Sequence, residues 1–205
     1  MAEKMEKLGV LCSGRGTDLQ SIIDAIARKE VTAEIAVVLT DKADAYALTR
    51  AEKAGIKAVC VNRKEYADRE SFEKAMVNEL EAAGVTLVVL AGFMRILTPY
   101  FVRKYAGRLL NIHPALLPSF PGAHAHRDVL AYGVKVSGCT VHFVDEGTDS
   151  GPIILQAAVP VLDDDTEETL GARVLAKEHV IYPQAIQLFC EGKLKIEDRK
   201  VRILE

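Results

Sequence analysis

Asn111 and His113 are the polar residues of this sequence whose types and spacing best fit chemistry. They end an apolar run, and the period of two in a β-strand places them on one face with Ile112 on the other. Pro114 favours an extended backbone at His113, which keeps the imidazole at the carboxyl edge of the expected sheet. This placement favours catalysis, although a hydrogen-bonded structural histidine fits the same pattern.

Asp149 stands in a turn-rich segment, DEGTDSGP, at residues 145–152. An aspartate before Ser-Gly-Pro is ordinary turn chemistry. A carboxylate beside His113 would instead orient the imidazole and favour its protonated form, which gives a proton donor near neutral pH. Both interpretations stay open, because the sequence does not show whether the two side chains meet.

The glycine-containing segment SGRGTD, residues 13–18, joins an expected strand to an expected helix. Free backbone N–H groups and the helix dipole at such a junction favour a bound anion such as phosphate. Leu19 occupies the third glycine position of a dinucleotide fingerprint, and no P-loop lysine follows, so both of those motifs are disfavoured. A tight turn that merely needs glycine is the alternative. The Asp18 side chain would repel a phosphate, so only its backbone is expected to help.

Glu178 falls on the apolar stripe of the last expected helix. A carboxylate on the core-facing side needs a partner, either a structural cation or a ligand that donates hydroxyl or amine hydrogens. His124 and His126 have no carboxylate or cysteine nearby to complete a ligand set, and the four cysteines show no Cys-x-x-Cys spacing. No metal site is therefore expected.

The elements that would position these residues alternate between strands and helices in the first half of the chain. Apolar or β-branched runs predict strands at 8–12, 34–40, 57–61, 86–91 and 108–112. Helices are expected at 17–29, 45–54 and 69–83. The pattern predicts a Rossmann-like, doubly wound α/β fold with a mostly parallel sheet.

The second half of the chain predicts an antiparallel extension of that sheet. Two longer strands are expected at 136–144 and 153–161, followed by a final helix that Thr166 caps. The segment 115–127 contains two prolines and a glycine, and we expect a mobile loop that acts as a lid. We expect one domain over residues 1–205.

Composition limits the class of protein. The 205 residues are 49% hydrophobic and 27% charged, as in globular domains with a sizeable core. Twenty-six Lys and Arg against 29 Asp and Glu give a net charge of −3, which disfavours nonspecific nucleic-acid binding. No stretch approaches the ~20 apolar residues of a membrane span, and the N-terminal apolar run is too short for a signal peptide, so we expect a cytoplasmic protein.

Longer motifs give the chain a resemblance to a known family. They are SGRGTDLQ (13–20), LAGFMRIL (90–97), LNIHPALLP (110–118), TVHFV (140–144), DSGPIILQ (149–156) and EHVIYP (178–183). In this order they closely resemble glycinamide ribonucleotide formyltransferase over nearly the whole chain. An Asn-x-His with a downstream Asp alone would indicate only the wider superfamily of folate-dependent formyltransferases and hydrolases.

The resemblance implies transfer of a formyl group from 10-formyltetrahydrofolate to the amine of phosphoribosylglycinamide, the third step of purine synthesis, without a metal. It implies that Asn111, His113 and Asp149 are catalytic. Both substrates are small molecules, and a monomer or homodimer without nucleic-acid or membrane partners is expected.

Binding residues also follow from the resemblance. Backbone groups of Gly16, Thr17 and Asp18 would hold the substrate phosphate, and Glu178 would take the ribose hydroxyls. Asp18 departs from the family, in which asparagine is usual, and this affects phosphate affinity rather than the type of reaction. The residues implied for folate are Arg69, near its acidic tail, Met94, Arg95, Ile96, Leu97, Asn111, Asp145, Glu146, Gly147, Thr148 and Asp149.

Three other functions compete with this interpretation. A formyltetrahydrofolate hydrolase would use a similar Asn, His and Asp with water as acceptor, but its family carries an N-terminal regulatory domain. A methionyl-tRNA formyltransferase normally carries a C-terminal RNA-binding domain. A noncatalytic nucleotide-binding module would keep the glycine loop without needing Asn111 and His113 to converge.

Overall fold

The apolar runs of the first half form the parallel part of a sheet in the computed structural model, which describes residues 5–205. The strands are β1 (Glu6–Cys12), β2 (Ala33–Thr40), β3 (Ala58–Cys60), β4 (Leu87–Leu90) and β5 (Leu109–His113). Their order in the sheet is β3-β2-β1-β4-β5, all parallel. The order reverses between β1 and β4, and ligands of open α/β sheets bind outside the carboxyl ends of the strands at such a point. The predicted doubly wound fold is confirmed.

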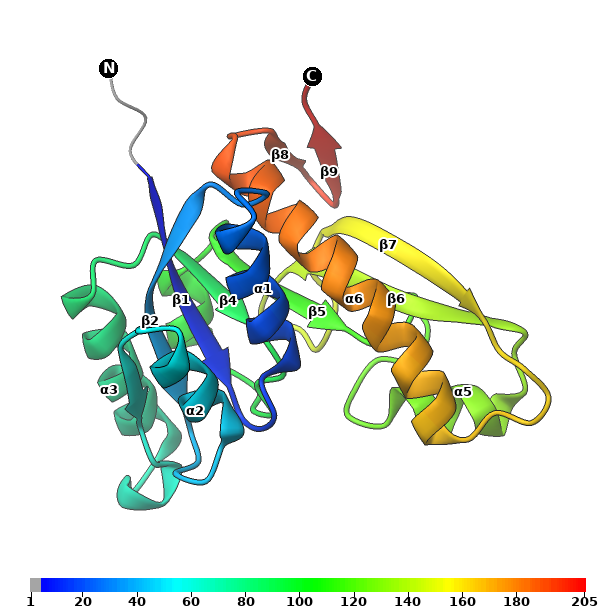
Figure 1. Ribbon diagram of the computed structural model, residues 1–205, viewed down its shortest axis with the longest axis horizontal. Helices are drawn as coiled ribbons and strands as arrows, with labels where there is room; N and C mark the ends of the chain where they lie inside the picture. Colours follow the sequence, from blue (N-terminus) through cyan, green and yellow to red (C-terminus); the bar gives the residue numbers. More distant parts are fainter. Residues whose placement is uncertain (1–4) are drawn as a thin grey trace.

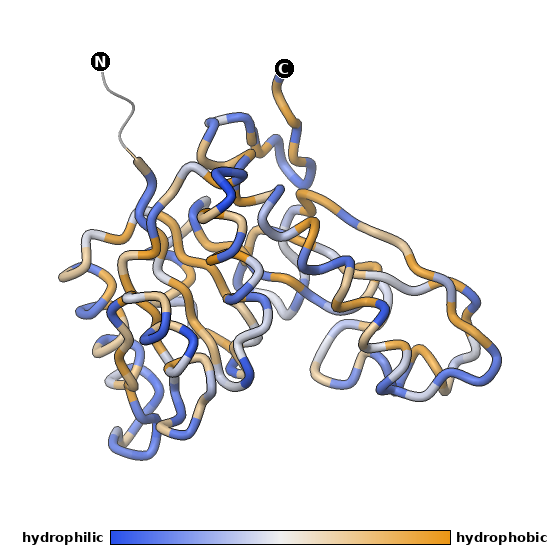
Figure 2. The backbone as a smooth tube through the Cα atoms, in the orientation of Figure 1, coloured by the Kyte–Doolittle hydropathy of each residue, from blue (hydrophilic) through white to orange (hydrophobic). Residues whose placement is uncertain are grey.

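Helices cover both faces of this sheet because successive strand residues point to opposite sides. Val38 packs in a cluster with residues of α1 (Thr17–Ala27), α2 (Tyr46–Lys53) and α6 (Glu167–Cys190). Its neighbours Val37 and Leu39 pack instead with α3 (Arg69–Ala82) and α4 (Pro99–Lys104). Figure 1 shows α1 and α6 side by side over one face. The hydrophobic stretches of Figure 2 follow the central strands between these helical layers.

The antiparallel extension is also confirmed. β6 (Val136–Phe143) pairs antiparallel with β5, and β7 (Ile153–Pro160) pairs antiparallel with β6. The register sets Asn111 opposite His142 and His113 opposite Thr140. Helix α6 then begins after Thr166, whose side chain accepts from the Thr169 backbone N–H in a capping box. The predicted cap is therefore correct.

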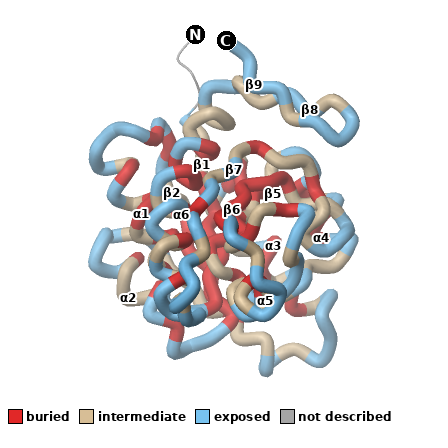
Figure 3. Tube along the Cα trace, turned by 90° about the vertical axis from the view of Figure 1, so that its right-hand side faces the viewer, coloured by how far each residue is buried: buried red, intermediate tan, exposed pale blue. Residues whose placement is uncertain are grey.

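Two helices and two strands, all short, were not expected from the sequence. The predicted loop 115–127 is too long, because α5 (Ala125–Tyr132) begins within it. Helix α4 lies after the fourth strand, and a C-terminal hairpin of β8 (Leu194–Glu197) and β9 (Lys200–Ile203) adds two strands to the sheet edge. The hairpin is mostly exposed (Figure 3), so little apolar burial marks it in the sequence.

Within residues 5–205, no helix combines the length and the apolar composition that a membrane crossing requires.

Candidate active site

His113 ends β5, and both nitrogens of its ring face oxygen atoms. Nε2–H donates to the carbonyl oxygen of Phe120 at 2.8 Å, and Nδ1 lies 3.4 Å from Oδ2 of Asp149. The His113 side chain is 5% exposed, so these two oxygens rather than bulk water orient the ring. The ring is therefore held at the end of β5 with the Asp149 carboxylate as its charged neighbour.

Asp149 reaches His113 from a strained turn. Its φ is +49°, in the left-handed region that aspartate tolerates better than most residues. Oδ2 accepts the backbone N–H of Gly122 at 2.8 Å, and Oδ1 lies 4.0 Å from Nε2 of His142. Asp149 therefore forms a turn and also places its carboxylate against His113, whereas its effect on proton transfer stays a prediction.

Asn111 is oriented by His142, which faces it across the β5–β6 pair. The Phe143 carbonyl accepts from Nδ1–H of His142 at 2.8 Å, and burial lowers the pKa of His142. The neutral ring therefore carries its hydrogen on Nδ1 and accepts one Asn111 amide hydrogen at Nε2, 3.2 Å away. The second amide hydrogen of Asn111 is then free for a ligand.

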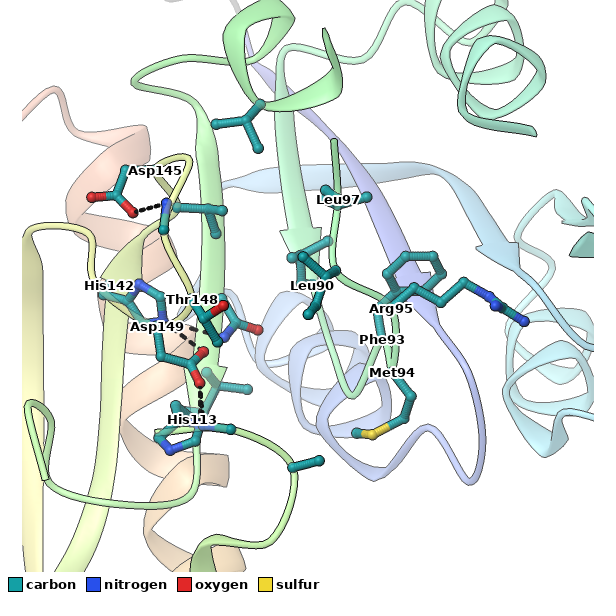
Figure 4. Close-up of a pocket in the computed structure, with 18 of the residues that line it drawn as sticks. Leu90, Phe93, Met94, Arg95, Leu97, His113, His142, Asp145, Thr148 and Asp149 are labelled. Carbon is teal, nitrogen blue, oxygen red and sulfur yellow. Dashed lines mark hydrogen bonds and ion pairs between the residues drawn. The ribbon is translucent and has the colours of Figure 1, made fainter. Parts of the chain in front are cut away.

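These side chains border a cavity of about 270 Å³ (Figure 4). Asn111, His113 and Asp149 all line it, so the structure brings the three predicted catalytic residues together. The opposite wall is the irregular segment 94–97, in which Met94 and Ile96 are about two-thirds exposed despite their apolar side chains. An open apolar wall facing convergent polar groups is typical of a site for a flat organic ligand.

The loop from Asp145 to Asp149 forms a further part of the cavity wall. Asp145 shapes it, because Oδ1 accepts from the Gly147 backbone and from the Ser150 hydroxyl, at 3.0 and 2.5 Å. Arg69 is the one residue implied for folate that does not line this cavity. It lines an adjacent hollow of about 390 Å³ on the other side of segment 94–97, together with Arg63 and Phe72.

The glycine loop lies outside the cavity that His113 lines. Gly16 has a φ of +69°, and a Cβ there would approach Ala47 to 2.9 Å, so this position requires glycine. Gly14 by contrast faces open space. Thr17 begins α1, so the first-turn N–H groups have no intrahelical partners. Residues 13–18 thus form a tight turn that needs glycine at position 16, and the same loop leaves backbone N–H groups available for an anion.

The buried acids Asp18 and Glu178 form a second cluster with the partly exposed His179. The two acids are 8% and 6% exposed. Burial raises the pKa of Asp18 to about 6, and burial together with the Asp18 charge raises the pKa of Glu178 to about 8. The imidazole of His179 lies beside Asp18, with Nε2 3.7 Å from Oδ1, and burial lowers the pKa of that imidazole. The Asp18 side chain is buried beside Glu178 and His179. The sequence analysis had assigned a role only to the backbone of Asp18, in phosphate binding.

His142 is the functional candidate that the sequence did not single out. It lies in the motif TVHFV, but only the antiparallel register with β5 places it beside Asn111. The backbone groups of Phe120 and Gly122 were missed for a similar reason, since any residue supplies them. His142 could have been predicted to lie beside Asn111 only if the pairing of β5 with β6 had been known.

No group of three His, Cys, Asp or Glu side chains in the described part of the chain is placed to hold a metal ion. His124 precedes α5, and His126 lies near Gly171 of α6. Burial lowers the pKa of His126, which is the effect of an apolar environment on an imidazole.

The sequence profile of the formyl transferase family matches residues 6–186. The chain belongs to the formyl transferase family. It is similar to phosphoribosylglycinamide formyltransferase of Escherichia coli, at 47% identity over 92% of this chain and 89% of that protein. It is also similar to the crystal structure of glycinamide ribonucleotide transformylase 1 from Symbiobacterium toebii, with a TM-score of 0.97, 50% identity and full coverage of both chains.

Two further relatives are a longer protein and a protein with a differently named activity. A trifunctional purine biosynthetic protein from Chironomus tentans is 46% identical over 95% of this chain, which spans only 14% of that protein's length. A formyltetrahydrofolate deformylase from Pseudomonas syringae shares the fold, with a TM-score of 0.91, at 26% identity over 98% of this chain and 67% of the other. The same fold thus occurs in a deformylase as well as in formyltransferases.

Proposed function

We propose that this formyl transferase family member transfers the formyl group of 10-formyltetrahydrofolate to the amine of phosphoribosylglycinamide. The products are formylglycinamide ribonucleotide and tetrahydrofolate. The convergence of Asn111, His113 and Asp149 on one cavity is the observation that carries the proposal. The 47% identity to a phosphoribosylglycinamide formyltransferase over most of both chains supports the choice of acceptor.

The chemistry follows from the hydrogen bonds of the three side chains. The amine nitrogen attacks the formyl carbon, and negative charge develops on the formyl oxygen. The free amide hydrogen of Asn111 and the His113 imidazolium stabilise this charge. Asp149, directly or through water, accepts the proton that the amine loses, and His113 or a relayed water protonates the folate nitrogen as the old C–N bond breaks. No step needs a metal.

The folate would occupy the cavity beside His113. Its flat pterin would lie between segment 94–97 and the loop Asp145 to Asp149, where exposed Met94 and Ile96 offer apolar contact. The acidic tail would extend toward Arg69, which lies on the far side of segment 94–97.

Phosphoribosylglycinamide would bind along the carboxyl ends of β1 and β4. The first N–H groups of α1, at Gly16, Thr17 and Asp18, would hold its phosphate. Glu178 would bind the ribose hydroxyls, which would donate hydrogen bonds to this buried carboxyl.

A formyl-transfer assay tests the proposal. The purified chain should release tetrahydrofolate from 10-formyltetrahydrofolate rapidly only when phosphoribosylglycinamide is present, and the His113→Ala variant should lose this activity. Equal release without the amine would indicate a hydrolase. No release in either case, with nucleotide binding retained, would indicate a noncatalytic module.

Domain extent, assembly and location belong to the same proposal. Residues 1–205 would act as one domain, in a monomer or homodimer, with two small-molecule partners. Phosphorylated substrates carry charges that are costly to move through a bilayer, so the enzyme would work in the cytoplasm where such compounds are retained.

A further inference from the structure

Segment 94–97 is a thin wall between two hollows. Its four residues line both the cavity beside His113 and the adjacent hollow bordered by Arg63, Arg69 and Phe72. The segment has no helical or strand hydrogen bonding. With space on both sides and no regular backbone pairing, packing alone does not fix its position.

Polar side chains from separate elements hold the backbone of this wall. The Ser13 hydroxyl, after β1, accepts from Met94 N–H at 2.9 Å. The Arg69 guanidinium, at the start of α3, donates to the Ile96 carbonyl. One turn further along α3, the buried Glu73 carboxylate accepts from the backbone N–H of Thr98 at 2.8 Å and from its hydroxyl.

The side chain of Arg95 provides the fourth anchor. It points away from the cavity (Figure 4), and its Nε lies 2.5 Å from Oδ2 of Asp41, just after β2. The guanidinium carbon lies 5.7 Å from the centre of the Phe72 ring. The Asp41 side chain is 1% exposed, and its other oxygen has no partner among the described residues. This buried carboxylate therefore depends on Arg95 for its pairing.

We propose that Asp41 is a positioning residue for the formyl donor and acts through Arg95. The ion pair fixes the backbone of segment 94–97, and that backbone sets the width of the cavity in which the folate binds. Without the carboxylate, the Arg95 side chain has space in the hollow behind the wall, and the wall loses its link to β2. This inference rests on the proposed function, because it assigns the cavity to the folate.

The test compares two Michaelis constants in Asp41→Ala. We expect KM for 10-formyltetrahydrofolate to rise about tenfold or more, since small displacements of binding groups are costly. KM for phosphoribosylglycinamide should change less than about twofold, because Gly16 and Glu178 lie outside this cavity. Asp41→Asn keeps a hydrogen-bond acceptor for Arg95 and should recover part of the lost affinity.

Two further variants connect the effect to the ion pair. Arg95→Ala should raise the donor KM by a similar factor, and the double variant should be no worse than the poorer single one. Asp44→Asn, an exposed aspartate in the same loop, is the matched control and should behave like the wild type. Calorimetric titration with tetrahydrofolate measures donor-site binding without turnover.

The outcomes are distinct. Equal rises in both Michaelis constants, or additive effects of Asp41→Ala and Arg95→Ala, would overturn the positioning role. If Asp41→Ala does not fold, Asp41→Asn decides, because it keeps the volume and one acceptor oxygen of the buried side chain while removing the charge that pairs with Arg95. A wild-type chain that neither binds tetrahydrofolate nor transfers formyl groups would refute the proposed function itself.

Discussion

Two clusters of buried polar side chains differ in how their hydrogen bonds are satisfied. In the His113 cluster (Asn111, His113, His142 and Asp149), each buried polar atom of the side chains has a partner within the described chain. In the Asp18 cluster (Asp18, Glu178 and His179), Oδ1 of Asp18 and Nε2 of His179 are buried and have no hydrogen-bond partner among residues 5–205.

The difference separates two kinds of preorganisation. A satisfied network holds its groups in one geometry before the substrate arrives, as charge stabilisation in a transition state requires. A cluster with an unpaired buried acid is unfavourable when empty and gains a hydrogen-bond partner from a ligand. The first cluster should therefore govern turnover, and the second should govern substrate affinity and the stability of the empty protein.

The largest effect is expected at His113 and Asp149. Asp149→Asn keeps a residue that tolerates the left-handed turn and removes only the charge, so turnover should fall by roughly 10²–10⁴. His113→Ala should cost a similar factor, and the double variant should add little, because both changes remove one proton-handling unit. Steady-state kinetics measure all three.

Asp198→Asn is the matched control for this pair. Asp198 also has a positive φ, +53°, but lies in the exposed turn between β8 and β9. Normal turnover in Asp198→Asn shows that the loss is specific to the site. Free-energy penalties of the two site variants that simply add would mean that His113 and Asp149 act independently.

Asn111→Ala should reduce turnover by roughly 10²–10³, because one donor to the developing oxyanion is lost. Binding of both substrates should change less, since this interaction strengthens in the transition state. Ser137→Ala, which alters another buried polar residue on the sheet, is the control and should leave turnover unchanged. Near-normal kcat in a folded Asn111→Ala would remove Asn111 from the mechanism.

Gly16→Ala should weaken the binding of phosphoribosylglycinamide, the ligand proposed for the Asp18 cluster and the glycine loop. The new Cβ would approach Ala47 at a backbone conformation that costs roughly 1–2 kcal/mol for a residue other than glycine, so the turn must shift. We expect KM for phosphoribosylglycinamide to rise by about tenfold, with a smaller change for the folate. Gly14→Ala places its Cβ in open space and serves as the control. Parallel rises in both constants would contradict phosphate binding at this loop.

The smallest effect concerns stability rather than turnover. The folded pKa values of about 6 for Asp18 and about 8 for Glu178 exceed those of unfolded carboxyls, so the folded state holds more protons between about pH 4 and 8. Stability of the empty protein from these groups therefore falls as the pH rises through this window. In Asp18→Asn, the decrease in the free energy of unfolding over this pH window should be smaller by about 1–2 kcal/mol.

Denaturant unfolding at pH 5 and pH 9 measures this difference between wild type and variant. Comparing the two proteins cancels the contributions of His126 and His142, whose lowered pKa values act in the opposite direction. Asp24→Asn, an exposed change on the same helix, controls for charge alone. An identical pH dependence in Asp18→Asn and wild type would show that Asp18 is ionised without cost.

The strand-and-helix order of the first half could be predicted because each parallel strand is a short, nearly continuous apolar run bounded by turn signals. The hairpin β8–β9 and helix α4 were missed, since each is short and carries few buried residues. Helix α5 was not predicted, and its first three residues were assigned to a loop because two prolines and a glycine precede them.

The sequence by itself determined which residue types stand at strand ends and helix starts, including Asn111, His113 and the glycine loop, because local periodicity and motif spacing are properties of the chain. Tertiary structure decided which of them meet. Strand pairing brought His142 to Asn111, a turn brought Asp149 to His113, and α6 crossing α1 brought Glu178 and His179 near Asp18. These contacts join residues far apart in sequence, and burial then sets their charges, which no local pattern records.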